Sequence, residues 1–163
     1  MQEQERNYSR DFDQPFTFKR RPVPVPAEAR PSWKVAELLV ILQISSRGGK
    51  STLKRLHLLN WAVRSVANRH AFRESRSAPS PLFRFNVRFE PAFSRAIDLA
   101  AGQSLVDWVS GDKIQLSAKG TELAQKILAD PAVLQEERAF LRDLGKSVTE
   151  KEADYVLGIR TRS

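Results

Sequence analysis

The sequence predicts a mostly helical α+β fold, in which a winged helix-turn-helix domain lies between an extended N-terminal arm and C-terminal helices. The first observation is a β-hairpin at residues 105–116, where Ser110-Gly111-Asp112 supplies a tight turn and Ile114 and Leu116 alternate on the return strand. The second is a helix start at Ser117, directly after the hairpin. The third is the helical spacing of apolar residues before the hairpin. A hairpin in this position is the wing of a winged helix.

Three regions divide the chain of 163 residues: the arm (1–31), the winged-helix domain (32–129) and a helical extension (130–163). A hydrophobic content of 41 % can fill the core of one compact domain of this size. The absence of cysteine excludes disulfides and thiolate zinc sites, and it favours a reducing compartment. The longest aliphatic run, residues 38–42, is far shorter than the roughly 20 residues of a membrane-spanning helix. We therefore expect a soluble cytoplasmic protein with no membrane partner.

The arm combines alternating prolines with several aromatic side chains. The prolines at positions 22–26 favour an extended polyproline II conformation. Phe12, Phe16 and Phe18 supply more apolar surface than a passive linker needs. We expect these phenylalanines to dock the arm either on its own domain or on a partner, and the sequence leaves both alternatives open.

Two helices are predicted at the start of the winged-helix domain. Ser32 would cap the first, whose apolar residues at positions 35, 38, 39 and 42 follow helical spacing. Further apolar residues off this stripe indicate burial on several sides, as in the centre of a small domain or of a dimer. The second helix is predicted over residues 51–67, with leucines on one face. Its opposite face carries a stripe of cations and aromatic rings: Lys50, Lys54, His57, Trp61 and Arg64.

The segment between this helix and the hairpin contains three shorter features. Residues 69–81 mix Arg, Ser, Ala and Pro, which predicts a mobile connection. Alternating apolar residues over 83–89 predict a short strand with one basic edge. Pro91 suits the first turn of a third helix that extends to Gly102.

The helical extension begins after a break in the chain. Asp130-Pro131 ends the helix that starts at Ser117, and a further helix is predicted over residues 132–144. A last short helix begins near Thr149, because Thr149 and Glu152 have the spacing of a capping box.

Positive charge is concentrated in the first part of the winged-helix domain. The chain has a net charge of +8, and residues 32–90 hold 11 Lys or Arg against 3 Glu, which equals the whole excess. A local field of this sign suits phosphate or an acidic protein surface. The alternative is an ordinary solvated face.

The stripe of Lys50, Lys54, His57, Trp61 and Arg64 combines cations with a flat aromatic ring. This mixture neutralises phosphates or anchors a protein interface. The plain alternative has Trp61 partly buried and the lysines in water. Because the two histidines of the chain have no second ligand at metal spacing and no nearby nucleophile set, we expect no metal, no cofactor and no catalytic residues.

Gly49-Lys50-Ser51-Thr52 imitates part of a phosphate-binding loop, but the spacing argues against a nucleotide-hydrolysing enzyme. Such a loop needs a glycine five positions before Gly49, where this chain has Ile44. Backbone amides at the helix start beside Lys50 could still accept one phosphate or carboxylate. The alternative is a simple glycine-rich connection between helices.

In a winged helix that reads DNA bases, the helix before the wing enters the major groove. The outward residues of this helix are Ser94, Arg95 and Asp98, and phosphates repel a carboxylate. The wing tip is also mixed, with Asp112 beside Lys113. We therefore expect no base-specific contacts from this helix.

Four short stretches of the chain resemble a known family. They are residues 47–50 (RGGK), residues 56–62 (LHLLNWA), residues 89–91 (FEP) and residues 114–120 (IQLSAKG). They are similar to the middle component of bacterial ABC three-component systems, which overlap with Lamassu-type antiphage systems. The resemblance covers residues 32–129, and its Gly-Gly-Lys and Leu-Asn-Trp parts are the more specific. It implies a small winged-helix accessory subunit between an SMC-like ATPase and an effector, often a nuclease, in a complex that senses foreign DNA.

The resemblance directs attention to Lys50, His57, Asn60 and Trp61, although the helical projection places Asn60 toward the core. The long arm departs from the compact pattern of the family. We expect a non-enzymatic adaptor that binds an SMC-like ATPase and an effector protein, with nonspecific phosphate contacts to DNA and with a homodimer as one assembly. The rival hypothesis is a winged-helix transcription regulator, which requires specific operator binding.

Overall fold

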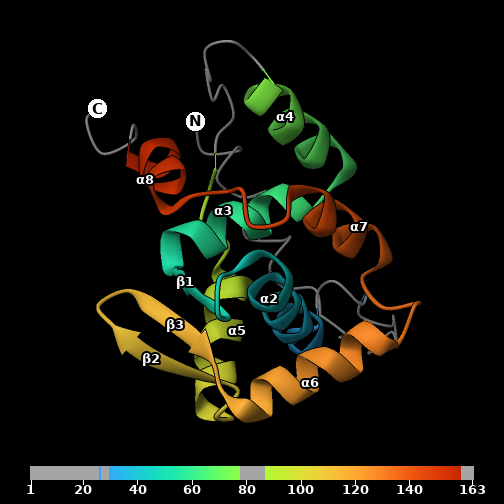
Figure 1. The fold of residues 1–163 in the computed structure, drawn as a ribbon, viewed down its shortest axis with the longest axis vertical. Coiled ribbons are helices and arrows are strands. Elements are labelled where there is room, and N and C mark those ends of the chain that lie inside the picture. The colour runs from blue at the N-terminus through green and yellow to red at the C-terminus, as the bar shows by residue number, and fades with distance from the viewer. Residues whose placement is uncertain (1–25, 27–29, 78–86, 159–163) are drawn as a thin grey trace, which may run out of the picture.

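The computed structural model describes residue 26 and residues 30–77 and 87–158 (Figure 1). The described part is mostly helical and contains one small antiparallel sheet, which confirms the α+β class. Its elements in chain order are α2 (Pro31–Ser45), β1 (Lys50–Thr52), α3 (Leu53–Val63), α4 (Val66–Ser77), α5 (Pro91–Gly102), β2 (Val106–Ser110), β3 (Lys113–Leu116), α6 (Ala118–Ala129), α7 (Gln135–Leu144) and α8 (Glu150–Gly158).

Helix α2 lies at the centre of the fold and packs against α3, α5, α6 and α7 (Figure 1). Residues 38–42 are fully buried, which fits a helix that is apolar on all sides. The prediction that Ser32 caps this helix is wrong. Arg30 occupies the cap position, where its side chain makes no capping hydrogen bond, and Pro31 starts the helix because its fixed φ already suits the first turn.

The sheet has the strand order β1-β3-β2, and both pairings are antiparallel. The predicted hairpin is confirmed: β2 and β3 pair around Gly111, whose φ of +54° suits a tight turn. Strand β1 was not expected, because residues 50–52 were assigned to the start of a helix. Three residues are too few for a recognisable alternation, and this strand is held by pairing with β3 from far along the chain.

The second predicted helix is divided into α3 and α4. Thr52 caps α3, since its hydroxyl accepts a hydrogen bond from the Arg55 amide. Helix α4 continues to Ser77, so the prediction of a mobile connection over residues 69–81 is wrong for residues 69–77. Phe72 explains the difference, because this ring is fully buried and lies 6.2 Å from the Phe140 ring of α7. One buried aromatic anchors a helix whose other residues are largely polar.

Of the strand predicted over residues 83–89, only residues 87–89 lie in the described part, and they form no strand there. Helix α5 begins at Pro91 as predicted. Ser117 caps α6, because its hydroxyl accepts a hydrogen bond from the Gly120 amide at 2.9 Å. These two helices and α2 form the lower half of the molecule in Figure 1.

The C-terminal helices also begin near their predicted positions. Helix α7 starts at Gln135, three residues later than predicted, and ends before Gly145. The capping box of α8 is confirmed: the Glu152 amide donates to the Thr149 hydroxyl at 3.1 Å, and the Thr149 amide donates to Glu152 at 3.4 Å. No helix of the described residues is long and apolar enough to cross a bilayer.

The arm falls outside the described residues, apart from Pro26, Arg30 before α2 and Pro31, which is the first residue of α2. The docking prediction for Phe12, Phe16 and Phe18 therefore remains a prediction.

Candidate functional site

The predicted stripe on the second helix does not form one exposed surface. His57 and Trp61 are only 5 % and 6 % exposed, whereas Lys50, Lys54 and Arg64 are exposed. The expectation that all five side chains share a solvent face is therefore wrong for the two aromatic residues. Helix α3 is covered by α2, α4 and α8. The face opposite its leucines is therefore also partly buried, although the sequence pattern predicts that it is exposed to solvent.

His57 belongs to an aromatic cluster rather than to a cationic surface. Its ring lies 4.3 Å from the Phe89 ring and 5.4 Å from the Phe93 ring. Burial lowers the pKa of His57, and the nearby Glu90 carboxylate opposes this effect only in part. The imidazole is consequently neutral at physiological pH and contributes no charge to phosphate binding.

The three exposed cations of the stripe lie in different surroundings. Lys54 donates to Asp154 of α8 at 2.9 Å, so its charge is already compensated. Arg64 follows the last residue of α3, and ten residues of helix place it about 15 Å from Lys54 along the axis. Lys50 lies at the other end, in β1, where it lines a cavity.

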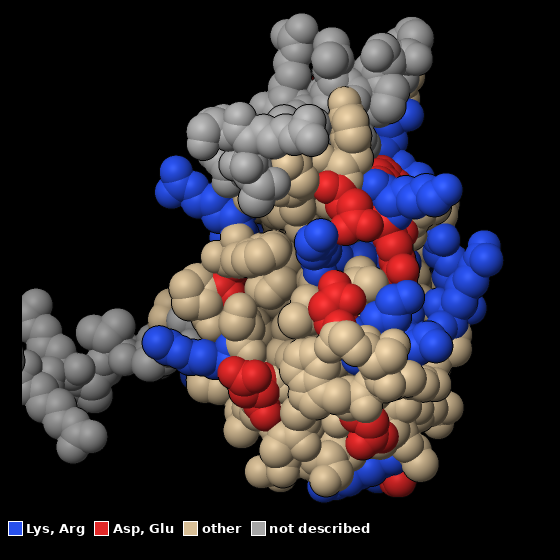
Figure 2. All heavy atoms as spheres, turned by 90° about the vertical axis from the view of Figure 1, so that its left-hand side faces the viewer, with Lys and Arg blue, Asp and Glu red and all other residues tan. Residues whose placement is uncertain are grey.

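This cavity of about 260 Å³ lies between the turn before β1 and the linker that joins α7 to α8. Gly48 and Gly49 form the turn with φ of +62° and +64°, a conformation that glycine adopts without strain. The residues that line the cavity are mainly basic: Arg47, Lys50, Arg55, Lys146, Val148, Thr149 and Glu150. Figure 2 shows the face of the molecule that lies on the left-hand side of Figure 1. On this face, Lys and Arg side chains gather at one border.

Arg55 forms the floor of the cavity and is 5 % exposed. Its guanidinium donates to the carbonyls of Val148, at 2.8 Å, and of Ser45. It also donates to the hydroxyls of Ser46 and Ser51, each at 3.0 Å. Burial lowers the pKa of Arg55, but a guanidinium stays protonated in proteins. Arg55 therefore holds a fixed positive charge under the cavity and fixes three segments around it.

The other basic residues of the cavity are not neutralised. Arg47, Lys50 and Lys146 are exposed, and no carboxylate of the described part of the chain forms an ion pair with any of them. Glu150 is the acidic group of the lining, and it pairs with Lys113 at 3.1 Å. The cavity therefore presents a net positive charge to solvent, which suits an anion.

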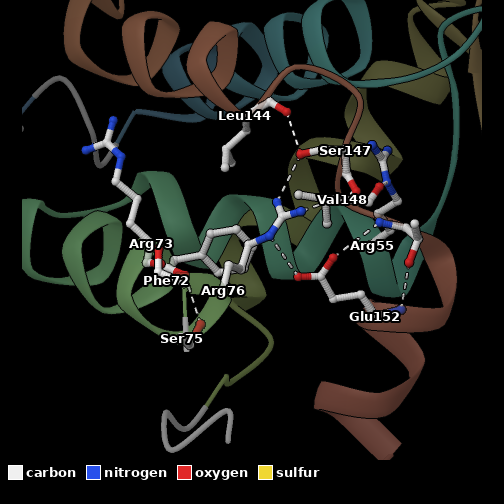
Figure 3. A network of polar contacts seen from close by, with 11 residues as sticks. Arg55, Phe72, Arg73, Ser75, Arg76, Leu144, Ser147, Val148 and Glu152 are labelled. Carbon is white, nitrogen blue, oxygen red and sulfur yellow. Dashed lines mark hydrogen bonds and ion pairs between the residues drawn. The ribbon is translucent and has the colours of Figure 1, made fainter. Parts of the chain in front are cut away.

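The wall formed by the linker is held from two sides (Figure 3). Arg55 of α3 binds the Val148 carbonyl, and Arg76 of α4 donates to the Ser147 hydroxyl at 3.1 Å and carbonyl at 3.4 Å. Arg76 also pairs with Glu152 of α8 at 3.4 Å. The linker is thus bound by α3 and by α4, so an anion would meet a preorganised site.

A second polar cluster is buried between α2, α3 and the start of α5. Lys34 pairs with Glu37 and with Glu90, each at 3.1 Å, and Asn60 donates to Glu90 at 3.0 Å. Burial raises the pKa of Glu37 to about 7, and Lys34 opposes this effect. Burial alone would also raise the pKa of Glu90, but Asn60 and Lys34 together lower it. Because Lys34 and Glu37 are about 5 % exposed, this cluster offers no access to a ligand.

The surface of α5 and the β2–β3 hairpin differs in character from the cavity. Arg95 and Asp98 are exposed on α5, and Leu99 is 44 % exposed beside them. On β2, Trp108 and Val109 are 51 % and 45 % exposed. Opposite charges and apolar side chains on this surface are more typical of a protein contact than of a phosphate contact.

Sequence analysis identified Lys50 but missed its partners in the cavity, Arg47, Arg55 and Lys146. The available signal for this site was Arg55 itself, an arginine at a helix position where an apolar residue is expected. Nothing in the local sequence connects Lys146 with the turn at Arg47. Within residues 30–77 and 87–158, no three His, Asp or Glu side chains gather as metal ligands would.

Comparison with known proteins identifies no relatives. No protein-family model, no curated protein and no solved structure matches this chain.

Proposed function

We propose that this chain is a winged-helix adaptor without enzymatic activity, which contacts nucleic-acid phosphates through the basic cavity and docks on protein partners through other surfaces. The observation that carries the proposal is the group of uncompensated cations, Arg47, Lys50 and Lys146, above the buried Arg55. Phosphate oxygens are the common ligands for such a group.

The order of elements supports a winged helix. Helix α2 is followed by β1, then by α3 to α5, and then by the β2-β3 hairpin, with β1 paired to the hairpin on β3. A winged helix has the same order with one helix fewer between the first strand and the hairpin, which is its wing. The basic cavity lies beside β1 rather than on α5. In this proposal the surface that contacts phosphates is therefore not the helix that would read bases.

The protein partners follow from the resemblance of residues 32–129 to the middle components of ABC three-component systems. In this proposal the chain binds an SMC-like ATPase and an effector, and it couples the sensing of foreign DNA to that effector. The mixed and partly apolar surface of α5 and the wing is suitable for such a contact. Co-purification of this chain with a co-expressed SMC-like ATPase of a three-component system tests the assignment. A stable complex supports it, and the absence of any complex overturns it.

The phosphate contact is tested by DNA binding of the full chain. We expect the triple variant R47A/K50A/K146A to bind duplexes of unrelated sequence with similarly reduced affinity. For this variant, the slope of log Kd against log salt concentration should be smaller by up to about 3, since each lost phosphate contact removes about 0.9 from the slope. Fluorescence anisotropy at several salt concentrations measures both quantities.

The matched control removes three exposed cations away from the cavity, on α6 and α7, in the variant K119A/K126A/R142A. It has the same net charge as the cavity variant, so it reports the general electrostatic effect. An equal loss of affinity in both variants, or no loss in the cavity variant, would contradict the assignment.

The rival function, a transcription regulator, predicts a different result in the same experiment. One duplex sequence would bind far more tightly than the others, and an Arg95→Ala change on α5 would reduce that preference. We expect no such preference, because the exposed Asp98 beside Arg95 disfavours close approach of phosphates.

A further inference from the structure

We propose that the N-terminal arm docks in its own chain, with Phe16 and Phe18 inserted in an apolar groove between α2, α5 and α6. This inference is independent of the phosphate site, and it assigns a place to aromatic side chains that the proposed function does not use.

The groove is a cavity of about 480 Å³, within the size range of binding sites for small apolar groups. Its lining is almost wholly apolar and comes from three helices and the residues after α5: Ser32, Val35, Ala36, Leu39, Leu99, Gln103, Leu105, Leu123 and Ile127. Leu99 keeps 44 % of its surface exposed at the edge of the groove. Because the polar groups of the lining are confined to Ser32 and Gln103, the groove suits an apolar occupant and not a charged one.

The position of the groove favours the arm as occupant. The wall formed by α2 begins at Ser32, one residue after Pro31 starts the helix, so the arm enters the fold at the mouth of the groove. A tethered segment has an effective concentration in the millimolar range at a nearby site. A second copy of the chain would need to reach that concentration in solution to compete.

The spacing of the phenylalanines also fits the groove. In an extended segment, residues 16 and 18 project to the same side and lie about 7 Å apart. The α2 wall from Ser32 to Leu39 covers two helical turns, which is about 10 Å. Twelve residues separate Phe18 from Pro31, and even half-extended they are long enough for the arm to turn back over α2. Phe12 would then lie beyond the groove, over its rim.

The absence of cysteine from the sequence allows a direct test with a single spin label. A nitroxide is attached to the full chain at Gln103→Cys, an exposed position at the groove, and amide signals of residues 12–14 and 16–18 are recorded by NMR. We expect paramagnetic broadening of these signals, and we expect the double change F16S/F18S to abolish it. A label at Lys151→Cys on α8, at the opposite end of the molecule, is the matched control and should leave the signals sharp (Figure 1).

A mixed sample distinguishes the arm of the same chain from that of a second copy. Spin-labelled chain without isotope is mixed with isotope-labelled chain without the nitroxide, so that only contacts between molecules cause broadening. Sharp signals in this sample, together with broadening in the first, support the proposal. Broadening in the mixed sample, or none in the first sample, overturns it. Neither readout depends on DNA binding, so failure here is distinct from failure of the proposed function.

Discussion

The side-chain Nε of Arg55 donates to the main-chain carbonyl of Val148 at 2.8 Å, and this bond joins α3 to a linker 93 residues later in the chain. The same guanidinium reaches the last carbonyl of α2 and two serine hydroxyls near β1. A single buried arginine therefore determines where the walls of the basic cavity stand relative to each other. Stability and the candidate function are coupled at this residue.

Replacement of Arg55 by Met should destabilise the protein by about 2–4 kcal/mol. The change removes the donors of four hydrogen bonds and leaves the buried acceptors, including the carbonyls of Ser45 and Val148, without them. Chemical denaturation measures the free energy of unfolding, and hydrogen exchange should show faster opening of α8. The exposed Arg95→Met on α5 serves as control and should change stability by less than about 0.5 kcal/mol. Equal effects of the two changes would contradict the role of Arg55.

Glu152 has two roles that two substitutions separate. Its carboxylate accepts from the Thr149 amide in the capping box, and it also pairs with Arg76 of α4. We expect Glu152→Gln to retain the capping box and to lower stability by less than about 0.5 kcal/mol. Glu152→Ala removes both interactions and should lower stability by about 1 kcal/mol. Thermal unfolding of both variants checks the order, and a loss for the Gln variant as large as that for the Ala variant would show that the ion pair, and not the cap, accounts for the effect.

The features that sequence analysis predicted correctly depend on neighbouring residues. The turn at Gly111, the cap at Ser117 and the capping box at Thr149 each involve side chains and backbone groups within a few positions. Such interactions leave recognisable residue patterns, because the same short segment carries both partners. The central position of α2 was similarly visible in its uninterrupted apolar residues.

The features that escaped prediction depend on contacts between distant segments. Strand β1 forms because β3 pairs with it, and α4 persists because Phe72 packs on α7. Helical projection assigned His57 and Trp61 to a solvent face, since it cannot show that neighbouring helices cover both sides of α3. The basic cavity escaped for the same reason, because Lys146 and Arg47 meet only in the folded chain.

The raised pKa of Glu37 gives a distinctive pH dependence. Its pKa is about 7 in the folded protein against 4.5 for an unperturbed group, so the folded state holds a proton that the unfolded state releases more easily. This contribution to stability is complete below pH 4.5 and is lost as the pH rises through 7. Between pH 5 and 8 the loss should amount to about 2–3 kcal/mol.

The variant Glu37→Gln isolates this contribution. Glutamine cannot titrate, and its oxygen can still accept a hydrogen bond from Lys34. Urea denaturation of both proteins from pH 5 to pH 8 should show the wild type losing stability relative to the variant. The comparison cancels the contributions of other carboxyl groups to the pH dependence of stability. Glu90 is one of them, and its lowered pKa changes stability at lower pH and in the opposite direction. Parallel curves for the two proteins would exclude a titrating Glu37.

Gly120 illustrates a position where the fold allows no side chain. A Cβ added there would lie 1.9 Å from the Leu105 carbonyl oxygen, which already accepts a hydrogen bond from the Ser117 amide. Helix α6 approaches the backbone that precedes β2 at this point, so the clash involves two rigid segments. We expect Gly120→Ala to destabilise the protein by about 3 kcal/mol, despite the better helix propensity of alanine.

The matched control is Gly102→Ala at the end of α5, where no atom beyond the chain neighbours and the helix's own backbone lies within 4 Å of the added Cβ. This change should leave stability unaltered or raise it by up to about 1 kcal/mol, because alanine restricts the unfolded chain. Thermal unfolding of both variants measures the contrast. Since both changes add the same methyl group to a helical glycine, opposite signs can arise only from the contact with Leu105. Equal signs would mean that α6 and the backbone at Leu105 do not meet as closely as the fold requires.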